Sequence, residues 1–201
     1  MNNAATLVLA SASLVRARAL KNAGVVFEID PSDVDENLIK QAMNARQASP
    51  KNVASELAAC KALAVSRRRP DDWIIGADQV LVFDNTIFDK PPSVREAASD
   101  LRRLRGHSHD LISAVCVAHG RQPEWHYAEA VKLHMRNFSD RFLESYLSET
   151  GETIVNSVGA YCLEGLGAQL FSRIEGDYFA ALGLPLMPLL SFLRSQSVIA
   201  T

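Results

Sequence analysis

The chain has 201 residues, of which 48% are apolar and 22% are charged, and its formal net charge at pH 7 is −2. A chain of this length and composition can bury a real hydrophobic core, as one large domain or as two small lobes. The chain has no excess of basic residues with which to bind the phosphate backbone of a nucleic acid, which argues against polymeric nucleic acid as a partner.

The cysteines and the N-terminus indicate a cytoplasmic protein. Cys60, Cys116 and Cys162 are far apart and show no CxxC spacing, which predicts reduced thiols rather than a zinc site. The first segment, MNNAATLVLASASLV, lacks the basic residues that begin a signal peptide. No run approaches the ~20 apolar residues of a membrane-spanning helix, so we expect no membrane partner.

Cap and stop signals divide the first part of the chain into strands and helices. Serines stand at the cap positions of two helices, which end at Gly24 and Pro70. In chain order, the predicted elements are a buried strand at 6–10, a helix at 11–24, a strand at 25–31, an acidic loop at 32–37 and a helix at 49–70.

The segment IIGADQVLVFDNTIFDKPP, residues 74–92, is typical of a β-hairpin with a turn at Asp84 and Asn85. Asp78 lies inside its apolar first arm. Leaving an ionised carboxylate unpaired there would cost several kcal/mol, so Asp78 needs a partner. Lys90, on the returning arm, lies across from Asp78 or diagonal to it, depending on the register.

The remaining elements indicate a mixed sheet with flanking helices. They are a helix at 93–106 with a capping box, two long antiparallel strands within 110–138, a capped helix at 139–151, a glycine-rich segment of strand composition at 158–185 and a closing helix at 185–195. Together they predict an α/β (mixed α+β) fold, with a mixed twisted sheet and two lobes around a deep cleft.

The segment SASLVR gathers groups that suit a phosphate. It lies where a buried strand turns into a helix, so free backbone N–H groups stand beside the hydroxyls of Ser11 and Ser13 and the side chain of Arg16. The alternative is that one serine simply caps the helix while Arg16 lies in solvent.

Two lysines and an acidic segment have alternative interpretations. An apolar stripe along the helix at 49–70 consists of Val53, Leu57, Cys60 and Ala64. Lys61 lies beside this stripe and either reaches solvent along it or points into a polar cleft and binds phosphate. Lys90 is likewise a plain ion-pair partner or a phosphate ligand. The acidic segment at 33–36 is by default a solvated loop, and otherwise a source of hard oxygen ligands for Mg²⁺.

Short motifs follow one another along the chain in a specific order. They are LASASLVR, DVDE, AACKA, IIGADQV, DKPPSVREA, LRGHSHDLISAV, GAYCLEGLGA and IEGDYFAALGLPL. This combination resembles the Maf family, the Maf-like nucleoside triphosphate pyrophosphatases, over nearly the whole chain. The resemblance implies one Maf-like domain over residues 1–201, a deep cleft between two lobes, and hydrolysis of a nucleoside triphosphate to the monophosphate and pyrophosphate. It also implies a divalent cation, Mg²⁺ or Mn²⁺, and allows a homodimer, since family members are often dimeric.

The resemblance also assigns roles to individual residues. Asp78 matches the catalytic base, which also binds the metal, and Glu36 matches the acidic metal ligand. The other matching residues are Lys61 and Lys90 for the two catalytic lysines, and Ser11, Ser13 and Arg16 for the phosphate-binding turn.

Departures from the family pattern concern the nucleotide base. Leu14 and Val15 replace a proline and the first of two arginines, and Val15 matches neither of two substrate branches. Gln79 and Glu164 resemble the branch of 7-methyl-GTP pyrophosphatases, because thymidine- and uridine-type members have threonine and glutamine there. We therefore expect a modified or non-standard triphosphate of the 7-methyl-GTP type as substrate.

Other functions compete with this expectation. The chain is alternatively a dTTP/UTP pyrophosphatase, a phosphatase of small metabolites, or a nucleotide-binding regulatory protein linked to septum formation. A regulatory protein would tolerate loss of Glu36, Asp78, Lys61 and Lys90, and their presence favours catalysis.

Overall fold

The computed structural model describes residues 5–200 and is built on one mixed sheet. The strand order is β2-β1-β3-β5-β6-β7, and β4 pairs with β3. β1 is parallel to β2 and β3, and the other pairs are antiparallel. The strands are β1 (Leu7–Leu9), β2 (Glu28–Ile29), β3 (Trp73–Phe83), β4 (Thr86–Phe88), β5 (Ser108–His119), β6 (Gln122–Met135) and β7 (Phe171–Glu175). The predicted mixed sheet is therefore confirmed.

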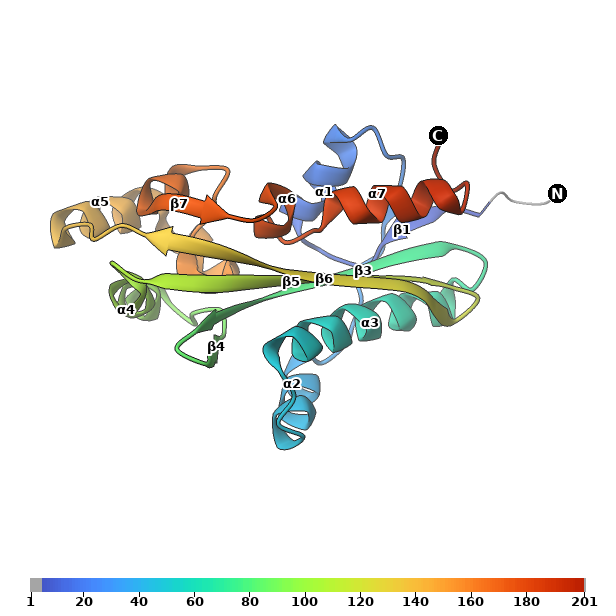
Figure 1. The fold of residues 1–201 in the computed structure, drawn as a ribbon, viewed down its shortest axis with the longest axis horizontal. Helices are drawn as coiled ribbons and strands as arrows, with labels where there is room; N and C mark the ends of the chain where they lie inside the picture. Colours follow the sequence, from blue (N-terminus) through green and yellow to red (C-terminus); the bar gives the residue numbers. More distant parts are fainter. Residues whose placement is uncertain (1–4, 201) are drawn as a thin grey trace.

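Helices cover both faces of this sheet (Figure 1). α3 lies on one face, and α1, α6 and α7 lie on the other, while α4 and α5 pack at one end. The helices are α1 (Leu14–Asn22), α2 (Glu36–Ala45), α3 (Pro50–Arg68), α4 (Val94–Leu104), α5 (Asp140–Thr150), α6 (Tyr178–Ala181) and α7 (Leu186–Ser195), with short 3-10 turns η1 (Gly151–Asn156), η2 (Val158–Ala160) and η3 (Leu166–Leu170).

Local sequence signals account for most of these boundaries. The side chains of Ser13, Ser49, Ser93 and Ser139 each accept a hydrogen bond from a backbone N–H in the first turn of α1, α3, α4 and α5. In the hairpin turn, Asp84 and Asn85 have φ of 48° and 57°, which short polar side chains tolerate. The predicted hairpin and these predicted helices are confirmed.

The edge of β3 that faces β1 is open in its middle. β1 pairs with β3 over Trp73–Ile75, and β4 pairs with it over Leu81–Phe83. Between these two segments, residues 76–80 have a strand partner only on the other side, in β5, within the described chain. Asp78 lies at the centre of this gap, so backbone and side chains from elsewhere can approach it.

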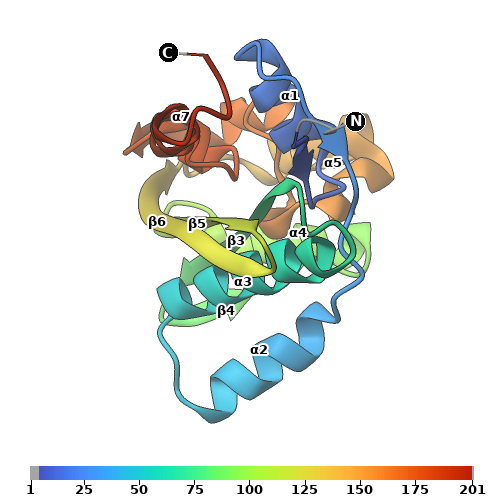
Figure 2. The same ribbon diagram turned by 90° about the vertical axis from the view of Figure 1, so that its right-hand side faces the viewer.

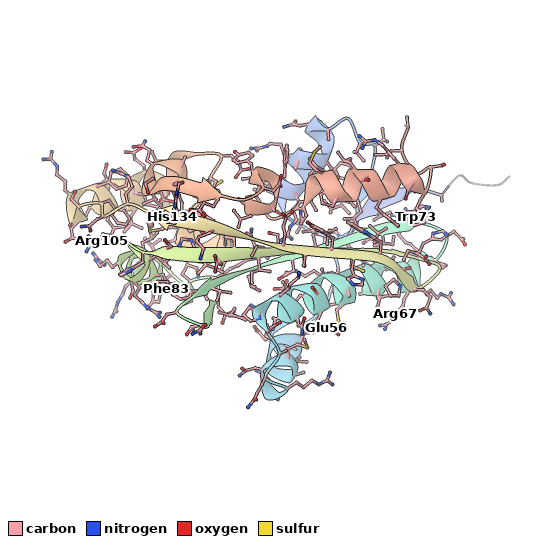
Figure 3. All side chains as sticks on the ribbon, in the orientation of Figure 1. Glu56, Arg67, Trp73, Phe83, Arg105 and His134 are labelled. Carbon is pink, nitrogen blue, oxygen red and sulfur yellow. The ribbon has the colours of Figure 1, made fainter. Side chains whose placement is uncertain are left out.

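Side chains alternate across β3, as strand geometry requires. Ile74 and Val80 join the apolar cluster beneath α3, whereas Ile75 and Ala77 join the cluster beneath α7. Asp78 shares the parity of Ile74 and Val80 and therefore faces α3. Figure 3 shows Glu56 and Arg67 on the side of α3 turned away from the sheet, so the helix directs its other side toward Asp78.

Two expectations about local structure are wrong. Only part of the acidic segment is a loop, because the Asp35 carboxylate accepts hydrogen bonds from the N–H groups of Asn37 and Leu38 and begins α2. The segment 158–170 forms 3-10 turns rather than strand, with φ of 77° at Gly159 and 57° at Ala160.

Figure 2 shows that α3 lies between α2 and the sheet.

Among residues 5–200, no helix is both long enough and apolar enough to span a bilayer.

Candidate active site

A cavity of about 1130 Å³ lies at the open edge of β3. One part of its wall comes from the β1–α1 turn, the start of α2, α3, β3 and the segment after β4. The other part comes from α5, η1, η2 and η3. Its volume is slightly above the usual range for small-molecule sites, about 300–1,000 Å³, so it can accommodate a ligand and is the candidate site.

Asp78 is paired with Lys61 inside this cavity. The Nζ atom of Lys61 lies 2.5 Å from Asp78 Oδ1 and 2.7 Å from Glu36 Oε1. Lys61 and Asp78 are 8% and 6% exposed, so one ammonium group holds two carboxylates at the base of the cavity. This contact satisfies the requirement that a buried carboxylate be paired.

The sequence interpretation of α3 needs correction. Its buried face contains Val53, Ala54, Leu57, Ala58, Lys61, Ala62 and Val65, whereas Cys60 and Ala64 are only partly buried. Lys61 therefore lies within the face that packs on the sheet, not beside it. Because α3 crosses over β3 at this point, the partner of Asp78 is a residue of α3 rather than Lys90 of the hairpin.

Glu36 stays ionised because of the surrounding lysines. Desolvation acts to raise the pKa of its carboxyl group, but the hydrogen bond and charge of Lys61, with smaller effects of Lys90 and Lys40, outweigh desolvation and lower the pKa. The site therefore keeps a half-exposed negative group, whose side chain is 41% exposed, beside the buried pair.

The absence of a side chain at Gly76 lets α3 approach β3 closely enough for the ion pair to form. A Cβ atom at this position would lie 2.5 Å from Ala62 N and closer still to Ala58 O, which are backbone atoms that cannot rotate away. Gly76 shares the strand face of Asp78, two residues on. This explains in physical terms why a glycine precedes Asp78 by two positions.

We expect Gly76→Ala to disturb both stability and catalysis. The added methyl group forces α3 away from β3, which should lower the free energy of unfolding by about 1–3 kcal/mol. The same shift separates Lys61 from Asp78 and should reduce kcat. Urea unfolding and steady-state kinetics measure the two effects.

Gly165→Ala is the matched control, since a Cβ atom there meets Cys162 O at 3.9 Å, an ordinary contact. Equal stability and kcat for Gly76→Ala and Gly165→Ala would contradict the proposed close packing.

The β1–α1 turn holds Arg16 in a fixed orientation. Its Nε donates to Gly183 O at 2.8 Å, and one guanidinium NH2 group, Nη1, donates to Ser11 Oγ at 3.1 Å and Ala77 O at 3.0 Å. Burial lowers the pKa of Arg16, while the charges of Asp78 and Glu36 act in the opposite direction. Arg16 is thus not a solvated surface residue, and no hydrogen bond in the described part of the chain uses its other terminal nitrogen, Nη2.

Ser11 and Ser13 lie in the same turn. Ser13 Oγ accepts from the N–H of Arg16 at 3.4 Å and caps α1, and Ser11 Oγ accepts from the N–H of Ser13 at 3.3 Å. Both serines and Val15 line the cavity. The turn therefore presents hydroxyls and the N-terminus of α1 to the cavity beside the guanidinium of Arg16.

Lys90 and Gln79 also line the cavity, in different ways. Lys90 is exposed and lies just beyond the end of β4. Gln79 Nε2 donates to Ser113 Oγ at 2.9 Å and to the carbonyls of Ala180 and Ala181 at 3.1 Å each. The amide of Gln79 is therefore engaged in holding β3 against α6, on the face opposite Asp78.

Glu164 is exposed and is not among the residues that line the cavity. Its Oε2 accepts a hydrogen bond from Cys162 Sγ at 2.8 Å, and Cys162 does line the cavity. Glu164 thus lies at the rim, in the turn between η2 and η3.

The donor set fits a hard divalent cation. Lys61 occupies one oxygen of Asp78 and one of Glu36, and the other oxygen of each accepts no hydrogen bond from the described residues. No group of three or more His, Cys, Asp or Glu side chains that could hold a metal occurs within residues 5–200. Mg²⁺ is commonly held by one or two carboxylates together with substrate phosphates, and Asp78 and Glu36 could supply the protein ligands.

Sequence reasoning missed several cavity residues. Lys40 lines the cavity from α2, a helix that was not predicted, and the spacing of four residues from Glu36 would have placed both on one helix face. Tyr161 also lines it, and its hydroxyl lies 2.7 Å from Nε2 of His109 behind it. Burial lowers the pKa of His109 to about 4, with a smaller contribution from His134, so His109 is neutral at pH 7.

The family model described as Maf-like protein matches residues 6–196. The chain belongs to the Maf family. A relative from Granulibacter bethesdensis, named nucleoside triphosphate pyrophosphatase, is 48% identical, and the match covers 96% of this chain and 98% of the relative. One from Paramagnetospirillum magneticum with the same name is 50% identical, over 94% of this chain and 97% of its own.

A further relative of this Maf-family chain carries a narrower name. The protein from Rhizobium meliloti named 7-methyl-GTP pyrophosphatase is 44% identical to this chain, and the match covers 96% of this chain and 97% of the relative. This Maf chain is therefore similar, over nearly its full length, to proteins with the broad name and to one with the narrow name.

Proposed function

We propose that this chain is a nucleoside triphosphate pyrophosphatase, a hydrolase that converts a nucleoside triphosphate to the monophosphate and pyrophosphate. The observation that carries the proposal is the contact of Lys61 Nζ with both Asp78 and Glu36 at the base of a large cavity. Membership of the Maf family and the names of its relatives support the same activity.

Asp78 is the proposed general base. Lys61 fixes one carboxylate oxygen, and the second oxygen is free to orient a water molecule and take its proton as the water attacks phosphorus. Lys61 holds both carboxylates in place, and its hydrogen bond and charge help to lower the pKa of Glu36. A divalent cation held by Glu36 and Asp78 would offset the charge on the phosphate oxygens when bound.

Basic side chains and hydroxyls are proposed to bind the triphosphate. Nη2 of Arg16 is oriented by the other nitrogens of the guanidinium, so it can donate to a phosphate oxygen without further ordering. Ser11 and Ser13 add hydroxyls, and the exposed Lys90 adds a positive charge that stabilises the leaving pyrophosphate. Phosphoryl transfer depends mainly on such positioning and charge.

A substrate panel tests the proposed class of reaction. The chain, with Mg²⁺, would be incubated with the canonical ribo- and deoxyribonucleoside triphosphates, with 7-methyl-GTP and with p-nitrophenyl phosphate. We expect consumption of one or more triphosphates and none of the simple phosphate ester. The reverse pattern would indicate a phosphatase of small metabolites, and nucleotide binding with no turnover would indicate a regulatory protein.

We further propose that the preferred base is guanine of the 7-methyl type. The carboxylate of Glu164 only accepts hydrogen bonds, which suits the N1–H and 2-amino donors of guanine. Methylation at N7 makes the base cationic, which a carboxylate at the rim also favours. Val15 and Gln79 line the same cavity, and Gln79 would act on the base indirectly, because it holds α6 and so positions Leu182 and Gly183, which follow α6 and line the cavity. The name of the Rhizobium meliloti relative supports this preference.

The preference predicts the behaviour of Glu164→Gln. Wild-type kcat/KM should be higher for 7-methyl-GTP or GTP than for dTTP and UTP, and the variant should shift the ratio about tenfold toward the pyrimidines, the value of one charged hydrogen bond. Glu152→Gln is the matched control, because Glu152 is exposed in η1 and does not line the cavity. A wild-type preference for dTTP or UTP would favour the dTTP/UTP alternative, and an unchanged ratio in Glu164→Gln would remove Glu164 from base recognition.

A further inference from the structure

Charge is unevenly distributed around the cavity. The wall formed by α5 and η1–η3 contributes neutral side chains, which include Thr150, Asn156, Ser157 and Tyr161. The basic residues that line the cavity all belong to the opposite part, on α1, α2, α3 and the segment after β4. A nucleotide in this cavity would therefore place its base and sugar toward the neutral wall and its phosphates toward the basic part.

Lys40 belongs to the basic part of the wall and has no role in the mechanism above. It lies four residues after Glu36 on α2, so both side chains lie on one face of the helix, and both line the cavity. The Lys40 side chain is 27% exposed. Lys40 is thus at the cavity surface, next to the carboxylate that Lys61 holds.

Lys40 is held by a partner that can release it easily. Its Nζ lies 2.6 Å from Oδ1 of Asp89, whose side chain is 72% exposed. An ion pair with so exposed a partner contributes little to stability, because water solvates the freed carboxylate well. A polyphosphate carries several negative charges and would compete with this single carboxylate for Lys40.

The position of Asp89 places Lys40 close to a second phosphate-binding candidate. Asp89 immediately precedes Lys90, and the ion pair joins α2 to the segment after β4 across the cavity rim. The charges of Lys90 and Lys40 both help to lower the pKa of Glu36, so both ammonium groups act on that carboxylate. The ion pair therefore brings Lys40 and Lys90, which both line the cavity, together at the part of the rim where α2 meets the segment after β4.

We propose that Lys40 is a further substrate-binding residue, which leaves Asp89 and contacts the terminal phosphates of the nucleotide, the part released as pyrophosphate. The inference rests on the proposed function and deepens it. In the free protein Asp89 pairs with Lys40 at the cavity rim, and the more highly charged phosphates displace this single carboxylate when the nucleotide binds.

Two variants of the same ion pair distinguish binding from a structural role. Lys40→Met should raise KM for the triphosphate about tenfold and raise the inhibition constant of inorganic pyrophosphate by a similar factor, with inhibition by the nucleoside monophosphate unchanged. Asp89→Asn frees Lys40 and should leave both constants unchanged or lower them. Lys51→Met, at an exposed position of α3 away from the cavity, controls for the loss of one positive charge.

If Lys40→Met and Asp89→Asn raise KM alike, the pair is a structural link and the proposal is wrong. Unchanged KM and pyrophosphate inhibition in Lys40→Met would overturn it equally. Titration calorimetry with Mg²⁺ and inorganic pyrophosphate tests the contact without turnover, and equal affinity of wild type and Lys40→Met would also overturn it. By contrast, a wild-type chain that turns over no triphosphate but binds pyrophosphate through Lys40 would refute only the proposed function.

Discussion

Replacing Asp78 by asparagine is expected to lower kcat at least ~10²-fold and to leave the fold and nucleotide binding largely intact. The amide keeps the shape of the carboxylate, and its oxygen can still accept the hydrogen bond from Lys61, which is also held by Glu36. What the variant lacks is a group that can take a proton from water and a charged ligand for a cation. Steady-state kinetics and nucleotide titration measure turnover and binding separately.

Two further variants control this experiment. Asp110→Asn makes the same substitution in an ion pair with Lys132 on β5 and β6, outside the cavity, and should keep wild-type kcat. Lys61→Met removes the shared ammonium and leaves two carboxylates unpaired, which should cost about 3–5 kcal/mol of stability as well as activity. Activity of Asp78→Asn within a few-fold of wild type would show that Asp78 is not the base.

Removal of divalent cations is expected to stop the reaction. Glu36 and Asp78 offer hard oxygen atoms without a soft ligand cluster, which suits Mg²⁺ or Mn²⁺ shared with the substrate phosphates. Excess EDTA should reduce the rate to the background level, and added Mg²⁺ or Mn²⁺ should restore it. The melting temperature without nucleotide should barely change, because two carboxylates alone bind such a cation weakly.

Glu36→Gln provides the control for this second result. It removes one proposed ligand and should raise the Mg²⁺ concentration needed for half-maximal rate, whereas Glu152→Gln, outside the cavity, should not. Full activity in excess EDTA would contradict a role for a cation and would show that Glu36 and Asp78 do not act as cation ligands.

The elements that could be predicted from sequence are those whose causes are local. The hairpin follows from β-branched residues on either side of Asp84 and Asn85, and α4 follows from Ser93 and Glu96 within one turn. Signals of this kind act over a few residues, so they do not depend on the rest of the fold. The long pair β5 and β6 was visible for the same reason.

The partner of Asp78 could not be predicted, because it depends on how two elements pack. Lys61 reaches Asp78 because α3 crosses β3 at the point where Gly76 leaves room. The hydrophobic pattern of either segment alone does not show where the helix crosses the strand. Sequence alone indicates Lys90 as a partner, because the residues nearest to a strand residue in a hairpin are expected on the opposite arm. The pairing ends at Phe88, before it reaches Lys90.

The helix α2 was missed for a different reason. None of its residues is fully buried, and Ile39 and Met43, four residues apart, pack against the cluster beneath α3, so the apolar pattern has helical spacing but covers only about two turns. Its N-cap is Asp35, and in a segment with several acidic residues this cap signal is not distinctive. Glu36 and Lys40 both lie on α2, so without this helix the sequence does not predict that the two side chains line the same part of the cavity.

The most direct test of the proposed function is the stoichiometry of products. Purified wild-type chain with Mg²⁺ and its best triphosphate would be sampled over time, with nucleotides separated chromatographically and pyrophosphate and orthophosphate measured in the same samples. We expect one pyrophosphate and one nucleoside monophosphate for each triphosphate consumed, and no diphosphate at any time. Orthophosphate released together with nucleoside diphosphate would contradict a pyrophosphatase built on Asp78, Lys61 and Glu36.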